Sequence, residues 1–189
     1  MNREKAWAIL NEYTANPALI RHGQCVEAAM RHYAAQCGAE VEQWGLAGLL
    51  HDFDYERFPE PPAHTREGAK ILRAEGCAEE VIDAILSHVP WNLDECPRDR
   101  PIRKTLFACD ELCGFLCAAS LVRPDRIVGL EPPSVIKKLK QKSFAANVSR
   151  KDVYAGAELL NLPLEVHVQN CIDALRAIAE QIDLLPRAT

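Results

Sequence analysis

The sequence predicts an all-α protein, because glycine is scarce, alternating strand-like patterns are nearly absent, and apolar residues recur at helical spacing. Only 9 of the 189 residues are glycine. A chain of this length fits one domain with a sizeable buried core. We expect a helical core over residues 1–124 and a C-terminal helical extension, residues 125–189, that packs on this core as part of one domain.

Helical spacing and capping signals predict the elements of the first part in order. Residues 3–14 form a first helix, and Asn16, as a cap before Pro17, begins a second that runs to about Gln36 and ends at Gly38. Further helices are predicted over residues 41–51, 65–75, 78–88 and 102–120. Prolines mark loops at residues 53–62 and 89–100.

The C-terminal part predicts shorter elements and one long helix. A basic helix is expected from Val135 to Lys142, with a solvated face as the simplest interpretation of its lysines. Ser149 and Asp152 have the spacing of a capping box at the start of a helix. A last helix is predicted from about Pro163 to Ile182.

Composition and charge exclude several classes of function. Hydrophobic residues make up 48% and charged residues 26%, as in globular proteins, and the net charge of −5 argues against a nucleic-acid polymer as partner. No apolar stretch approaches the roughly 20 residues of a membrane helix, and no signal peptide is recognisable. The 8 cysteines form no Cys-x-x-Cys pair and indicate reduced core thiols, so we expect a cytoplasmic protein.

A dipeptide, His51-Asp52, follows the apolar run of residues 44–50 and is the clearest functional signal. A buried imidazole beside a buried carboxylate is costly unless something binds both. Further candidate ligands of a metal lie at helix ends or in helices on either side: His22, His64, His88 and Asp110.

This mixture of histidine and aspartate suits a divalent transition metal. Imidazole favours iron, manganese, zinc or nickel, and carboxylates also accept magnesium. The set is large enough for one or two ions. His32 and His167 are expected to be ordinary hydrogen-bonded histidines.

The order His22, His51-Asp52, Asp110 resembles the H…HD…D pattern of the HD-domain superfamily of metal-dependent phosphohydrolases. The resemblance covers roughly residues 18–120. The segment with His64 and Gly68-Ala69, together with His88, resembles the extra histidine motifs of the subgroup that binds two metals. It implies an HD-domain helical bundle with a first metal on His22, His51, Asp52 and Asp110. A second metal would bind His64 and His88, with Asp52 as the bridge.

The resemblance implies a hydrolase of a small phosphorylated molecule, a nucleotide monoester or a phosphoanhydride, that uses a water activated by the metal. Two alternatives stay open: a diiron oxygenase of the same superfamily, and a metal- or nucleotide-binding sensor without catalysis. The sequence does not indicate an oligomeric state.

The residues after the dipeptide depart from the family pattern. Many members have a lysine shortly after it, whereas this chain has Asp54 and Glu56. Beside the catalytic Asp52, Asp54 is a candidate general base or a partner of a ligating histidine, with a plain loop charge as the alternative. Candidate cations for a substrate phosphate, each with a surface role as its alternative, are Arg103, Lys104, Arg66 and Arg21.

Overall fold

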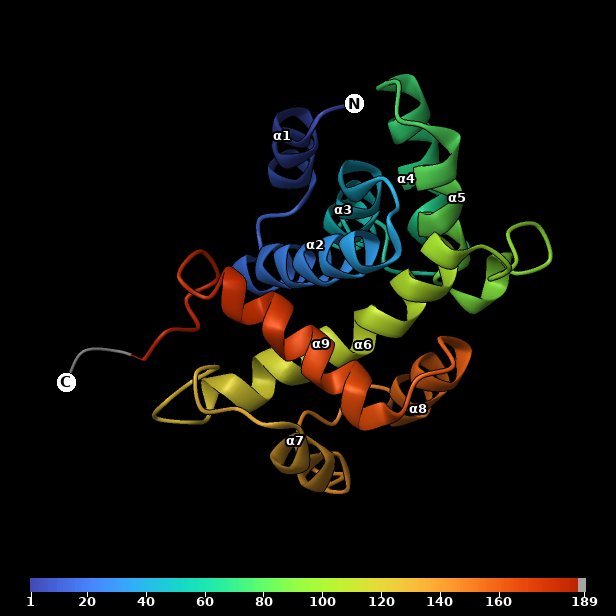
Figure 1. Ribbon diagram of the computed structural model, residues 1–189. Helices are drawn as coiled ribbons and strands as arrows, with labels where there is room; N and C mark the ends of the chain where they lie inside the picture. The colour runs from blue at the N-terminus through green and yellow to red at the C-terminus, as the bar shows by residue number, and fades with distance from the viewer. Residues whose placement is uncertain (187–189) are drawn as a thin grey trace.

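The computed structural model describes residues 1–186, and this part of the chain contains α-helices, one short 3₁₀ helix and no strand (Figure 1). The predicted all-α class is therefore confirmed. The helices of the first part are α1 (Arg3–Tyr13), α2 (Pro17–Cys37), α3 (Val41–Leu50), α4 (Ala63–Ala74), α5 (Glu79–Ser87), η1 (Pro90–Asn92) and α6 (Pro101–Leu121).

The predicted start and end of α2 are confirmed in detail. The Asn16 side chain accepts a hydrogen bond from the Ala18 N–H at 2.9 Å, and Pro17 occupies the first turn. Gly38 ends the helix with φ of 68°, a left-handed conformation that glycine adopts without strain. These signals fix the length of the helix that carries His22.

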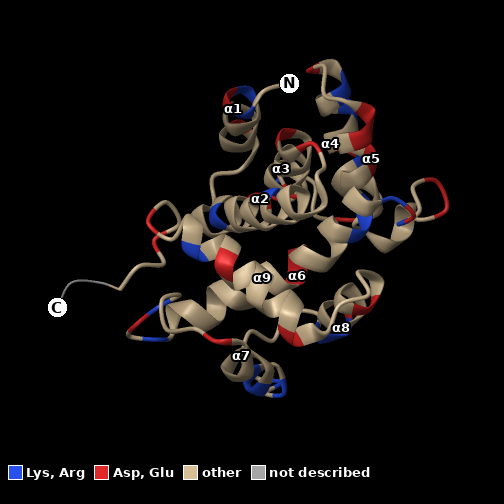
Figure 2. Cartoon of the chain, viewed as in Figure 1, with Lys and Arg blue, Asp and Glu red and all other residues tan. Residues whose placement is uncertain are grey.

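The C-terminal part contains α7 (Pro132–Leu139), α8 (Arg150–Leu159) and α9 (Leu164–Ala177). The predicted bounds of α7 were wrong: it begins at Pro132 rather than Val135, because a proline fits the first turn of a helix, where its missing N–H is not needed. Val135 and Leu139 are buried, and Figure 2 shows the basic residues at the surface of this helix.

The predicted end of α9 was also wrong, since the helix stops at Ala177 and not at Ile182. Ile178 leaves the helical conformation, with φ of −118° and ψ of 16°. The following turns bring Ile182 and Leu184 into the core, and the Ile127 N–H donates to the Leu184 carbonyl at 3.2 Å. Burial of these two side chains thus outweighs continued helical hydrogen bonding.

Helices α2 and α6 form the centre of the molecule. Helix α2 packs against α3, α6 and α9, and α6 also packs against α8 (Figure 1). One hydrophobic core extends from Ala6 in α1 to Leu184 after α9, so the C-terminal helices share the core of the first part. The division of the chain at residue 124 stays a prediction.

The buried His167 of α9 connects the two central helices. Its Nε2–H donates to the Ala108 carbonyl of α6 at 2.9 Å, and its Nδ1 accepts from the Tyr33 hydroxyl of α2 at 2.6 Å. Burial lowers the pKa of His167, which keeps the ring neutral for both bonds. This histidine therefore fixes α6 two residues before Asp110.

Replacement of His167 tests this connection. We expect His167→Ala to lower the free energy of unfolding by about 3 kcal/mol, because it leaves a cavity and removes two buried hydrogen bonds. Chemical denaturation measures the change. The matched variant His32→Ala alters a histidine on the outside of α2 and should stay within about 0.5 kcal/mol; equal losses in both variants would contradict the assigned role.

Candidate metal centre

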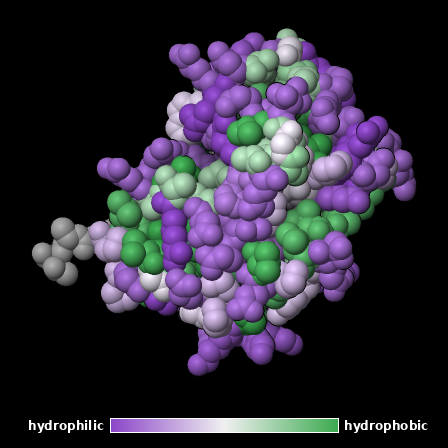
Figure 3. Space-filling model, viewed as in Figure 1, coloured by the Kyte–Doolittle hydropathy of each residue, from purple (hydrophilic) through white to green (hydrophobic). Residues whose placement is uncertain are grey.

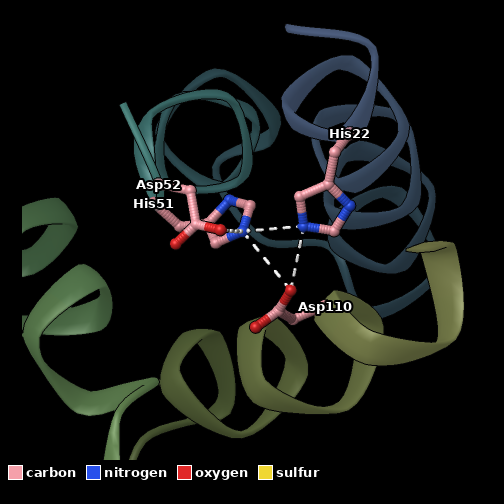
Figure 4. A group of neighbouring side chains, drawn as sticks. All are labelled: His22, His51, Asp52 and Asp110. Carbon is pink, nitrogen blue, oxygen red and sulfur yellow. Dashed lines mark hydrogen bonds and ion pairs between the residues drawn. The ribbon is translucent and has the colours of Figure 1, made fainter. Parts of the chain in front are cut away.

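Four side chains from α2, the end of α3 and α6 converge at one point (Figure 4). The Nε2 atom of His22 lies 3.0 Å from Asp110 Oδ1 and 3.1 Å from His51 Nε2. His51 Nε2 lies 3.4 Å from both Asp52 Oδ2 and Asp110 Oδ1. The structure thus brings together His22, His51, Asp52 and Asp110.

A second group adjoins the first and shares Asp52 with it. The Nε2 atoms of His64 and His88 lie 3.3 and 3.4 Å from Asp52 Oδ1. Asp52 therefore presents Oδ2 to the first group and Oδ1 to the second. One carboxylate lies between both sets of imidazoles, as a bridging ligand would.

Hydrogen bonds orient three of the histidine rings. The Nδ1–H of His51 donates to the Gly48 carbonyl at 2.8 Å, and that of His88 donates to the Ile85 carbonyl at 2.6 Å. The Nδ1–H of His64 donates to Asp54 Oδ1 at 2.9 Å. Carbonyl and carboxylate oxygens can only accept a hydrogen bond, so Nδ1 of each ring must carry the proton. In the neutral ring Nε2 is then unprotonated and faces Asp52, in the form that binds a metal.

The spacing of these atoms fits a divalent cation. Nε2 of His51 faces the lone pairs of Asp52 and Asp110, so a cation must lie between them, either a metal ion or a proton on the ring. Metal–ligand bonds of about 2.0–2.2 Å place neighbouring ligands roughly 3 Å apart, close to the distances in both groups. The donor set of imidazoles and carboxylates suits a transition metal.

The pKa shifts report the same concentration of charge. Burial alone would lower the pKa of His51, but the charges of Asp52 and Asp110 outweigh it and raise that pKa well above its usual value. Burial would also lower the pKa of His64. Hydrogen bonds to Asp52 and Asp54 outweigh this effect and raise that pKa to about 9. Despite their burial, the carboxyls of Asp52 and Asp110 have lowered pKa values because the charge and hydrogen bonds of neighbouring histidines stabilise their ionised forms.

A close helix contact produces the first group. A Cβ atom added to Gly48 of α3 would lie 2.7 Å from the Val26 carbonyl oxygen of α2, so only glycine permits this approach. The contact brings the end of α3, with His51, next to the turn of α2 that carries His22. Helical hydrophobic patterning predicts both helices, but the meeting of their histidines depends on this contact.

Asp54 lies behind His64 and not at the cleft, which corrects the expectation of a general base. Its side chain is buried, and it accepts hydrogen bonds from His64 Nδ1, the Thr65 N–H at 2.9 Å and the Gly68 N–H at 3.0 Å. Thr65 has φ of 69°, and this left-handed turn aims its N–H at the carboxylate. These bonds make Asp54 a partner of His64, the alternative that the sequence left open.

Both groups open into a cleft of about 500 Å³. Sequence reasoning missed several of its lining residues: Tyr55, Trp91, Glu111, Asn147 and Asp152. Glu111 directly follows Asp110, which was an available signal; Asp152 carried only the signal of a helix cap. Burial and the charge of Asp110 raise the pKa of Glu111.

The four predicted phosphate-binding cations lie outside the lining of this cleft. Arg103 pairs with Asp83 at 2.8 Å, and Arg66 pairs with Glu95 at 3.0 Å. Lys104 lines a separate pocket beside Tyr33 and Trp44. Arg21 lies 4.0 Å from Asp183. Competing carboxylates draw the arginines elsewhere, so the described lining of the cleft contains no lysine or arginine.

The described residues form an all-α protein with two adjoining histidine–aspartate groups that could hold a metal ion. The family model described as HD domain matches residues 20–110, which include all six clustered residues. Residues 20–110 thus form an HD domain, whose fold is that of metal-dependent hydrolases. No solved structure matches the chain. None of the helices within residues 1–186 combines the length and the hydropathy of a membrane-spanning segment. The face of the molecule drawn in Figure 3 is largely hydrophilic.

Metal binding should release protons. The raised pKa values of metal-free His51 and His64 mean that both rings are protonated near pH 7, and a metal must displace these protons. Affinity should therefore rise with pH up to about 9. Titration calorimetry in buffers with different ionisation enthalpies measures the release, and a flat affinity between about pH 6 and 8 would contradict this expectation.

Asp54→Asn tests the partner of His64. The amide can offer its oxygen to His64 Nδ1 only by turning its NH2 group toward the Thr65 and Gly68 N–H groups, and it has no charge to stabilise the ring. Affinity for a second ion should therefore fall about 10- to 100-fold while the first ion stays bound. Metal titration with elemental analysis gives both values. Asp94→Asn, at an exposed position, is the matched control; unchanged binding of both ions in Asp54→Asn would refute the assignment.

Proposed function

We propose that this protein is a metal-dependent phosphohydrolase that cleaves a phosphate monoester of a small molecule. The observation that carries the proposal is Asp52, whose two oxygens face two separate sets of imidazoles. A nucleotide monoester or a phosphoanhydride is the substrate class that the sequence suggests. Iron, manganese, zinc and nickel match the ligands best.

In this proposal the residues of the first group are His22, His51, Asp52 and Asp110, and those of the second are His64 and His88 with Asp52 shared. A divalent cation held there supplies Lewis acidity toward phosphate oxygens and toward water. His51 and His88 stay oriented through their bonds to backbone carbonyls, and Asp54 does the same for His64. These fixed rings avoid reorganisation during the reaction.

The absence of lysine and arginine from the described cleft lining supports a binding mode in which the metal centre alone receives the phosphate. Arg98, from the loop before α6, donates to the carbonyls of Ser87 and His88. Its role in this proposal is to hold the end of α5 and thereby His88. Positive charge at the reacting phosphate then depends on metal loading.

His51→Ala and Asp52→Asn test the proposal. Each removes a ligand, so we expect loss of bound metal and a decrease of at least about 1,000-fold in phosphate release. Elemental analysis and a phosphate-release screen over monoesters and anhydrides measure both effects. Full activity in a metal-free variant would refute the proposal. Oxygen uptake without phosphate release would identify an oxygenase instead, and a nucleotide recovered intact would identify a sensor.

A further inference from the structure

Residues that come after Asp110 in the sequence form one wall of the cleft, and this wall carries carboxylates that belong to neither metal group. Glu111 of α6 and Asp152 of α8 line the cleft, together with Asp52 and Asp110. The nearby Arg98 is engaged with backbone carbonyls and stacks on the Phe107 ring at 3.6 Å. The described cleft lining contains no lysine or arginine, although the charge of Arg98 behind it acts on Asp110 and Asp152.

Glu111 and Asp152 are linked through the cap of α8. The Ser149 hydroxyl accepts from the Asp152 N–H at 3.3 Å, which is the first half of a capping box. In the second half, the acidic side chain would accept from the Ser149 N–H. Here Glu111 Oε2 takes that N–H at 3.0 Å.

This replacement has a consequence for Asp152. Because Glu111 accepts the Ser149 N–H, the Asp152 carboxylate takes no part in the cap, and Asp152 lines the cleft. Glu111 uses one oxygen for Ser149 and keeps the other. The pair therefore offers carboxylate oxygens that helix capping does not consume.

Aromatic side chains also line this cleft. Tyr55 and Trp91 flank His64, with ring centroids 5.1 and 6.0 Å from it. The Trp91 Nε1–H is buried and has no hydrogen-bond partner. Aromatic faces attract organic cations, and an unpaired buried donor favours a ligand with an acceptor oxygen.

We propose that the substrate is a phosphate monoester with an ammonium group, which Glu111 and Asp152 bind while the metal centre receives the phosphate. This inference rests on the proposed function. Two divalent cations would balance the carboxylates of Asp52, Asp110, Glu111 and Asp152. The charges of Arg98 and Asp54 beside the cleft offset each other, so the site offers no surplus positive charge to an anionic substrate. A substrate cation offsets part of the phosphate charge, and extra phosphates would be repelled by Glu111 and Asp152.

Binding of phosphonates, which hydrolysis cannot cleave, tests recognition apart from turnover. The probes are 3-aminopropylphosphonate and butylphosphonate, which have the same shape and differ in the ammonium. Calorimetry on the manganese-loaded full chain should give at least about tenfold tighter binding of the amino compound. In Glu111→Gln and Asp152→Asn this ratio should fall toward one.

The variants keep the local structure. Glutamine and asparagine have the shape of the acids, and the amide oxygen introduced by Glu111→Gln would still accept the Ser149 N–H. Glu158→Gln removes an exposed carboxylate from the same α8 and should keep the full preference. Thermal unfolding verifies that each variant is folded. A loss of bound manganese in Glu111→Gln or Asp152→Asn would assign these acids to metal binding and overturn the inference.

Hydrolysis of the corresponding esters separates the two proposals. The wild-type kcat/KM for 2-aminoethyl phosphate should exceed that for propyl phosphate about tenfold or more. Equal binding of both phosphonates, or a preference that persists in both acid variants, would overturn the ammonium inference even if esters are cleaved. A clear binding preference without phosphate release from either ester would overturn the hydrolase proposal and leave ammonium recognition standing.

Discussion

The structure of the site depends on the carboxylate of Asp52, which lies between two sets of imidazoles. Each oxygen faces different rings, so a displacement of this one side chain changes both groups. The chain fixes it through its neighbour His51, which is buried and bonded to the Gly48 carbonyl. The close contact of α2 and α3 at Gly48 is therefore a structural condition of the metal centre as well as of the core.

The sequence predicts the helices well, and the six candidate ligands it singles out do cluster in space, because both leave local signals. Asn16 and Gly38 delimit α2 through their own capping chemistry. The ligands are residue types whose burial requires a partner. His22 and Asp110 lie 88 residues apart, and no local signal indicates that they meet in space. Only the family resemblance predicts their contact.

The failed predictions have a common physical origin in competition between distant groups. Arg103 was predicted as a candidate cation for a substrate phosphate, but Asp83 and Asp99 bind its guanidinium. Propensity continued α9 to Ile182, whereas burial of Leu184 turns the chain earlier. Asp54 has the charge of a base, but its surroundings make it a fixed acceptor. None of these outcomes can be derived from spacing along the chain.

The bond from Ser149 to Glu111 joins the cap of α8 to the residue directly after the last metal ligand. The family match ends at residue 110, so this wall of the cleft comes from sequence outside the matched segment. In the proposals made above, the metal ligands and the carboxylates that bind the substrate ammonium therefore come from separate stretches of the chain. A match to the HD-domain model includes the ligands but excludes this wall, so such a match alone would not identify the substrate.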